Sequence, residues 1–302
     1  MEPRMTRREF IAQAAMVGAA VSGASLFGTQ VFAAPESVIA VAANAEPGLL
    51  ARQAVKALGG MRLFVKPGQR VIVKPNASYA CPPEQAVTTH PAIVAEVIKM
   101  CHEAGAAEVI VLDSPVEPAR KAFDISGIRE AAEQEKAGVM LASSFYRPLA
   151  VPRGQVLNTM TVHVGKDVLE ADVIISVPIA KAHAATGYSL GLKSLMGLVR
   201  NRQAWHTSAS LDQCIADFAT AIRPRLTILD AHRILLTNGP KGPGETKDVG
   251  QVIAGTDPVA VDAYAVTLFG ATAADVPHIA AAARLGVGQM DLKQVRIKKT
   301  SV

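Results

Sequence analysis

Short runs of β-branched and other apolar residues alternate with helical patterns through nearly the whole chain. Six runs are apolar enough to be strands buried on both faces, at residues 38–42, 71–73, 109–112, 173–177, 226–229 and 252–254. Helix-start signals at Pro91, Ser126, Asp257-Pro258 and Pro277 lie between or after these runs, and glycines end the helical patterns. The alternation predicts an α/β fold, with a mostly parallel sheet flanked by helices.

The size of the chain bears on its domain organisation. With 302 residues, 50% of them hydrophobic and 19% charged, the composition excludes disorder and collagen-like repeats. A chain of this length is enough for one large domain or two modest ones. We expect two lobes that share a cleft, with the boundary between residues 144 and 172.

Charge and cysteine content exclude several classes of function. Lysine and arginine number 31 against 26 acidic residues, without a basic run, and aromatic residues make up 4%, so we expect no nucleic-acid binding. Cys81, Cys101 and Cys214 form no C-x-x-C pair, which excludes an iron–sulfur cluster built from this chain alone. Cys101 and Cys214 fall in step with apolar helix positions and are predicted to be buried thiols.

The N-terminal segment resembles a twin-arginine export signal. Arg7 and Arg8 are followed by Phe10, a moderately apolar stretch and a small-x-small-like cleavage site before Ala34. Residues 11–32 could alternatively form a membrane anchor, but several polar residues and glycines dilute the stretch. We therefore predict a signal peptide at residues 1–33, removed to give a mature chain of 34–302. The expected partner is the twin-arginine translocation machinery, the expected location is periplasmic or otherwise exported, and no membrane span remains after cleavage.

The densest group of polar residues follows the strand that ends at Val177. Lys181, His183 and Lys193 lie there, with Arg200, Arg202 and His206 shortly after. Open α/β sheets place ligands at the carboxyl ends of their strands, so these residues are candidates for a site. The stretch is not a phosphate-binding P-loop, because that motif needs glycine directly before the lysine and Leu192 stands there.

Other strand ends and loops carry further candidates. His90 lies at a helix start after two threonines. Either a threonine caps the helix and His90 is a surface residue, or His90 is a ligand or a neutral base, since a helix N-terminus disfavours the imidazolium. Asp113 and Ser114 end a buried strand and either orient a histidine, bind a cation or cap a turn. Asp257 is predicted to be an N-cap. The loop 237–245 either closes over a ligand, contacts an anion through Lys241 or is a plain surface turn.

Several of these segments together resemble the domain of unknown function 362 family. The matching pieces, in chain order, are residues 73–76, 88–91, 113–115, 181–183, 186–197, 205–206, 238–240 and 255–262. They cover most of the mature chain, so the chain is identified as a member of that family.

A more distant similarity is to nickel-pincer lactate racemases. It rests on His183, the Gly187-Tyr188-Ser189 segment, Lys193 and His206. The resemblance implies that His183 transfers protons, that Lys193 is bonded to an organic cofactor and that His206 ligates nickel, with His90 as the second base. Imidazole suits nickel, and lysine can tether an organic cofactor. Lys181, Asp113 and Ser114 are further candidates for cofactor binding.

The sequence thus predicts an exported enzyme that depends on a metal or cofactor and acts on a small anionic metabolite. Racemase-like proton or hydride transfer is one form of this chemistry. Arg200 and Arg202 are the expected substrate contacts, because a guanidinium matches a carboxylate or phosphate. Two alternatives stay open. One is a periplasmic binding or cofactor-maturation protein without turnover, and the other is a purely structural network of Lys193 and the histidines.

Overall fold

The computed structural model describes residues 36–142, 145–207 and 210–301. The predicted signal peptide at residues 1–33 lies outside the described residues. Residues 36–302 form one compact unit, so the predicted division into two lobes with a boundary between residues 144 and 172 is not confirmed. Within the described chain, no helix has the length and apolar character needed to cross a bilayer.

Twelve strands and ten α-helices make up the described elements. The strands are β1 Ser37–Ala43, β2 Arg70–Pro75, β3 Glu108–Asp113, β4 Gly138–Leu141, β5 Tyr146–Leu149, β6 Val162–Gly165, β7 Val173–Val177, β8 Ile179–His183, β9 Gly187–Ser189, β10 Leu226–Leu235, β11 Thr246–Gly255 and β12 Val295–Ser301. The helices are α2 Pro47–Ala57, α3 Pro91–Glu103, α4 Ala119–Ile125, α5 Ile128–Gln134, α6 Lys166–Glu170, α7 Gly191–Ser194, α8 Gln203–Thr207, α9 Leu211–Ala221, α10 Pro258–Thr267 and α11 Pro277–Arg284.

The central sheet is mostly parallel, as predicted. Its strand order is β12-β1-β11-β10-β7-β2-β3-β4, and all neighbours from β10 to β4 are parallel. β11 is the exception, because it runs antiparallel to both β1 and β10. β8 continues beside β10 and pairs with β9, so the polar residues that follow Val177 lie largely in a β-hairpin, which the sequence did not predict.

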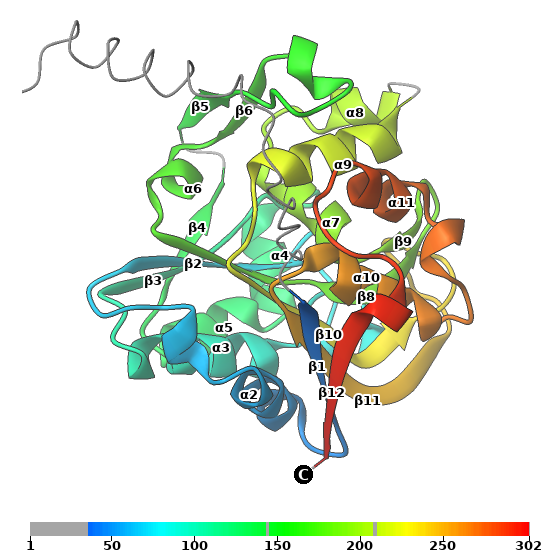
Figure 1. The fold of residues 1–302 in the computed structure, drawn as a ribbon. Coiled ribbons are helices and arrows are strands. Elements are labelled where there is room, and N and C mark those ends of the chain that lie inside the picture. The colour runs from blue at the N-terminus through cyan, green and yellow to red at the C-terminus, as the bar shows by residue number, and fades with distance from the viewer. Residues whose placement is uncertain (1–35, 143–144, 208–209, 302) are drawn as a thin grey trace, which may run out of the picture. The chain divides into compact units, whose positions relative to one another are not determined.

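Two hydrophobic cores pack on opposite faces of the sheet. Alternate residues of a strand point to opposite faces, and in β2 Val71 and Val73 join one core while Ile72 joins the other. Helices α2, α3 and α5 cover the first face, and α7, α9, α10 and α11 cover the second (Figure 1). Burial on both faces explains why these strands read as nearly continuous apolar runs.

The predicted helix-start signals hold with one correction. Prolines begin α3, α10 and α11, and the Asp257 side chain accepts hydrogen bonds from two backbone amides at the start of α10. Ser126 instead ends α4, and Gly127, in a left-handed conformation, precedes α5. The sharp turn between these two short helices needs that backbone conformation, which glycine adopts without steric cost.

Candidate functional site

A cavity of about 300 Å³ lies beside the carboxyl ends of β2 and β8. Such strand ends are where open α/β sheets place ligands. The cavity combines lysines, an arginine, histidines and small polar residues, and no carboxylate is among its described lining residues. The lining residues are Asn76, Ser78, Tyr79, Val116, Lys181, His183, Ser189, Lys193, Ser194, Met196, Gly197, Arg202, Gln203, His206 and Pro240.

Helix α7 brings Lys193 and Ser194 to the cavity, and a carboxylate far along the chain holds its first turn. Asp262 of α10 is fully buried and accepts hydrogen bonds from the backbone amides of Gly191 (2.7 Å) and Leu192 (2.8 Å). A side chain at Gly191 would place its Cβ 2.8 Å from the Asp262 Oδ1 atom. The close approach therefore requires glycine, and the carboxylate satisfies amides that have no partner within the helix.

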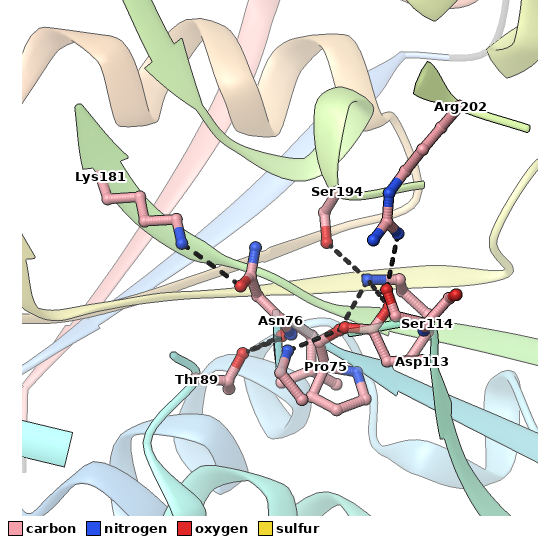
Figure 2. Close-up of polar contacts among 11 residues, drawn as sticks. Pro75, Asn76, Thr89, Asp113, Ser114, Lys181, Ser194 and Arg202 are labelled. Carbon is pink, nitrogen blue, oxygen red and sulfur yellow. Dashed lines mark hydrogen bonds and ion pairs between the residues drawn. The ribbon is translucent and has the colours of Figure 1, made fainter. Parts of the chain in front are cut away.

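Lys74, at the end of β2, lies under the cavity in a buried ion pair with Asp113. Its Nζ atom is 3.0 Å from the Asp113 Oδ1 atom, and it donates to the Pro75 carbonyl (2.6 Å) and to the Ser194 hydroxyl (3.0 Å) (Figure 2). These contacts use all three protons of the ammonium. Burial lowers the pKa of Lys74, and the Asp113 carboxylate opposes this shift.

Lys181, from β8, is also fully occupied by protein acceptors. Its Nζ atom donates to the carbonyls of Val87 (2.6 Å) and Pro240 (3.1 Å) and to the Asn76 side chain (3.4 Å). Burial, followed by the nearby charge of Lys193, lowers the pKa of Lys181 to about 7. The three acceptors favour the ammonium form, so Lys181 has no donor left for a cofactor.

Lys193 differs from the other two lysines. Its side chain is 8% exposed, and within the described chain its Nζ atom has no hydrogen bond or ion pair with the protein. Burial, followed by the positive charge of Arg202, lowers the pKa of Lys193 to about 8, and Asp212 partly opposes this. One Arg202 nitrogen donates to the Ser114 carbonyl at 2.6 Å, which aims the guanidinium at the cavity (Figure 2).

His183 and His206 line the same cavity with stacked rings. Their ring centroids are 6.3 Å apart and the planes are inclined by 19°. Burial and the nearby Lys193 charge lower the pKa of His183 to about 3, and burial also lowers that of His206. The His183 Nδ1 atom accepts from the Ala185 amide at 3.1 Å, so the proton of the neutral ring is on Nε2.

Two predicted site residues lie elsewhere. His90 is the N-cap of α3, where its Nδ1 atom accepts from the Ala92 amide, and its ring contacts His232 at a centroid distance of 5.9 Å. This differs from the expectation that a threonine caps the helix, because the Thr89 hydroxyl accepts from the Asn76 amide instead. The buried Asp230 carboxylate accepts from the His90 amide at 2.8 Å and fixes the position of His90. The Arg200 guanidinium lies over the Tyr146 ring, and neither residue is among the cavity lining.

Comparison with known proteins identifies the family. The model of the family described as Domain of unknown function (DUF362) matches residues 71–267. The chain belongs to this family. Its similarity extends to a thylakoid-associated protein of Synechocystis sp., with 32% identity over 248 residues, which covers 78% of this chain and 74% of the relative.

Two solved structures are similar to this DUF362 protein at low sequence identity. The lactate racemase apoprotein from Thermoanaerobacterium thermosaccharolyticum has 14% identity and a TM-score of 0.44, over 72% of this chain and 54% of that one. A protein from Thermotoga maritima has 12% identity and a TM-score of 0.46, over 75% and 60% respectively. The chain thus spans less than two thirds of the length of either solved chain.

The remaining candidates from the sequence of this DUF362 member are Asp113, Ser114 and the loop at 237–245. Asp113 and Ser114 contact residues around the cavity. Asp113 accepts from the Ala77 and Ser114 amides and pairs with Lys74, and the Ser114 carbonyl holds Arg202. Both positions support lining residues without lining the cavity themselves. The loop at 237–245 is tied down by an ion pair between Lys241 and Glu117 at 2.6 Å.

Several cavity residues were not predicted as site residues from the sequence. Asn76 and Ser194 line the cavity, and Lys74 contacts Ser194 without lining the cavity itself; all three belong to segments that match the family. Lys74 and Asn76 could have been found from the sequence, because they lie at the end of a buried apolar strand. A charged side chain there costs free energy unless it is paired, which indicates a buried polar network.

The donor set limits how a metal could be held. Among residues 36–142, 145–207 and 210–301, no group of three or more histidine, cysteine or acidic side chains is placed to hold a metal ion. Lys193 and His206, for which the resemblance implies cofactor attachment and nickel ligation, both line this cavity.

Proposed function

We propose that this DUF362 protein is an enzyme that binds a small anionic metabolite in the cavity, with Lys193 as its reactive residue. One observation carries the proposal: the Lys193 ammonium is buried and has no protein acceptor in the described chain. A buried, unpaired charge costs free energy, and a bound anion offsets that cost. Arg202 adds a second cation with open donors.

The ionisation of Lys193 fits covalent chemistry. A pKa of about 8 leaves a useful fraction of neutral amine near neutral pH, and a desolvated lysine amine attacks carbonyl carbons or tethers an organic cofactor. In the proposal the neutral Lys193 amine would hold the cofactor, which leaves Arg202 as the cation for the metabolite, and His206 would bind a metal that imidazole suits, such as nickel. When bound, that group supplies the proton- or hydride-transfer chemistry at the carbon next to the carboxylate.

The chain's own residues orient the metabolite. Arg202 pairs with the anionic group, and the neutral His183 ring donates a hydrogen bond to the metabolite through Nε2. The stacked His183 and His206 rings, rather than His90, supply the two imidazoles of this proposal.

A second candidate function is a binding or cofactor-maturation protein without turnover. The hydrogen bond from the Ala185 amide to His183 Nδ1 favours it, because the proton then occupies Nε2 and the ring donates instead of accepting. A binding protein would use this donor only to hold the anion.

We extend the proposal to export through the twin-arginine translocation machinery. The Arg7-Arg8 segment supports it, and a relative described as thylakoid-associated is compatible with it. Replacing both arginines with lysine should retain the protein in the cytoplasm in its native host, as measured by fractionation. Unchanged export of that variant would remove this part of the proposal.

The enzyme proposal is tested on protein exported by its native host. Intact mass and metal analysis are made on one sample, with Lys193→Met as the control. A mass adduct at Lys193 that the variant lacks supports the enzyme. An unmodified, metal-free chain that binds oxalate without turnover supports the binding protein instead. A chain with neither adduct nor anion binding contradicts both.

A further inference from the structure

We infer that Ser194 is a further ligand-binding residue, whose hydroxyl donates a hydrogen bond to an oxyanion of the bound metabolite. This inference rests on the proposed anion binding and adds a donor to it. Ser194 lines the cavity beside Lys193 at the end of α7, and it is 5% exposed. The direction of its hydroxyl proton follows from the contacts beneath it.

The Lys74 ammonium can only donate to Ser194. An ammonium carries three protons and no lone pair, so in the 3.0 Å contact the Ser194 Oγ atom is the acceptor. The other Lys74 protons go to the Pro75 carbonyl and to Asp113. The Ser194 proton must therefore point away from Lys74, and in the described part of the chain no protein acceptor receives it.

The Asp113 carboxylate fixes the direction of the hydrogen bond from Lys74 to Ser194. It is fully buried, and backbone amides of Ala77 (2.8 Å) and Ser114 (2.9 Å) hold both of its oxygens. The carboxylate in turn favours the charged form of Lys74 and opposes the effect of burial on its pKa. A Cβ atom at Gly197 would overlap Asp113 and lie 3.0 Å from Lys74 Nζ, so backbone covers the ion pair closely. A covered ion pair has strong, fixed electrostatics.

The neighbouring donors define the ligand class. Lys193 and Arg202 line the same cavity and have open N–H groups. Three donors without a lining carboxylate match the lone pairs of a carboxylate or phosphate group. Figure 2 shows Ser194 and Arg202 on the same side of Asp113.

Ser189 offers a matched control within the chain. It lines the same cavity from β9 and is 4% exposed, yet no cation among the described residues donates to its hydroxyl. A serine-to-alanine change there removes the same atom from the same cavity. The two variants thus distinguish the Ser194 hydroxyl, whose proton is oriented by Lys74, from the Ser189 hydroxyl, which is a polar lining group without such orientation.

Calorimetric titration with oxalate and with inorganic phosphate tests the inference on the full exported chain at neutral pH. Ser194→Ala should weaken binding of the preferred probe about tenfold to a hundredfold, because a hydrogen bond to a charged group is lost. Ser189→Ala should weaken it less than about threefold. The preference between the two probes separates a carboxylate ligand from a phosphate ligand.

Ser194→Ala also removes an acceptor from Lys74, and this loss could impair folding. A second variant controls for that effect. Ser194→Cys keeps the shape but replaces the hydroxyl with a weak donor, and it should show a similar loss. Equal affinity of wild type and both Ser194 variants overturns the inference while leaving anion binding intact. Equal losses at Ser189 and Ser194 also overturn it. A wild type that binds neither probe overturns the proposed function and this inference together.

Discussion

The buried lysines on the two sides of the cavity differ in how many protein acceptors they contact. On the strand side, Lys74 and Lys181 each contact three protein acceptors, and both are 1% exposed. On the helix side, Lys193 is nearly as buried but has no acceptor within the described residues. Burial alone therefore does not tell a structural cation from a ligand-binding one. The count of satisfied donors does.

The difference assigns separate physical tasks to the two sides. The strand-side lysines join segments distant in sequence, since Lys181 connects β8 to the Val87 and Pro240 carbonyls. Their removal should cost folding stability. Lys193 carries a desolvation cost in the free protein, so its removal should cost binding instead.

The largest expected effect is on the strand side. Lys74→Met leaves the buried Asp113 carboxylate without its cation, and breaking such a pair costs about 3–5 kcal/mol of unfolding free energy. Urea or guanidinium unfolding measures it. Lys193→Met is the control and should raise the stability near neutral pH, by at most about 3 kcal/mol, because it removes an unpaired buried charge. Similar losses in both variants would remove the distinction between the two sides.

The next effect is the pH dependence of stability. Lys193 titrates at about 8 in the folded protein against an ordinary value of 10.5, so between these values the unfolded chain binds more protons. Stability from this group therefore rises with pH across that window, by at most about 3 kcal/mol. The measurement is the difference in unfolding free energy between wild type and Lys193→Met from pH 7 to 10.5. A difference that stays constant with pH would show that Lys193 titrates normally.

A smaller effect is expected on anion affinity. Lys193→Met should weaken oxalate or phosphate binding about tenfold to a hundredfold, which corresponds to about 1.4–2.7 kcal/mol. Wild-type affinity should also fall as the pH rises above about 8, because Lys193 then loses its charge. Lys241→Met, which changes an exposed lysine outside the cavity lining, is the control and should bind normally. Normal binding by Lys193→Met would contradict the assignment of the helix side.

The smallest effect concerns the loop at 237–245. Glu117→Gln removes the ion pair with Lys241, but exposed pairs contribute little. Affinity for the probe should change less than about threefold, as measured by the same titration. The Lys181 contact to the Pro240 carbonyl still holds the loop in that variant. A large loss would show that the ion pair, and not Lys181, positions this side of the cavity.

Local sequence patterns were sufficient for most of the fold. The strand at 71–73 was recognisable because residues buried on both faces form a continuous apolar run, and α3, α10 and α11 were recognisable from proline at their starts. His183, Lys193 and His206 were grouped because they lie close in sequence after one strand end, and all three line one cavity. The hairpin at 179–189 was missed, since its small and polar residues are also typical of loops.

The sequence by itself determined the α/β class, the family and the segment that carries Lys193. Only the tertiary structure decided which charged groups are satisfied, because those partners lie far apart along the chain. Asp262 holds the first turn of α7 from 71 positions away, and Lys74 contacts Ser194 from 120 positions away. His90 was placed with His232 by the same kind of distant contact. Hydrogen bonding depends on distance and direction in space, and residue order specifies these only between near neighbours.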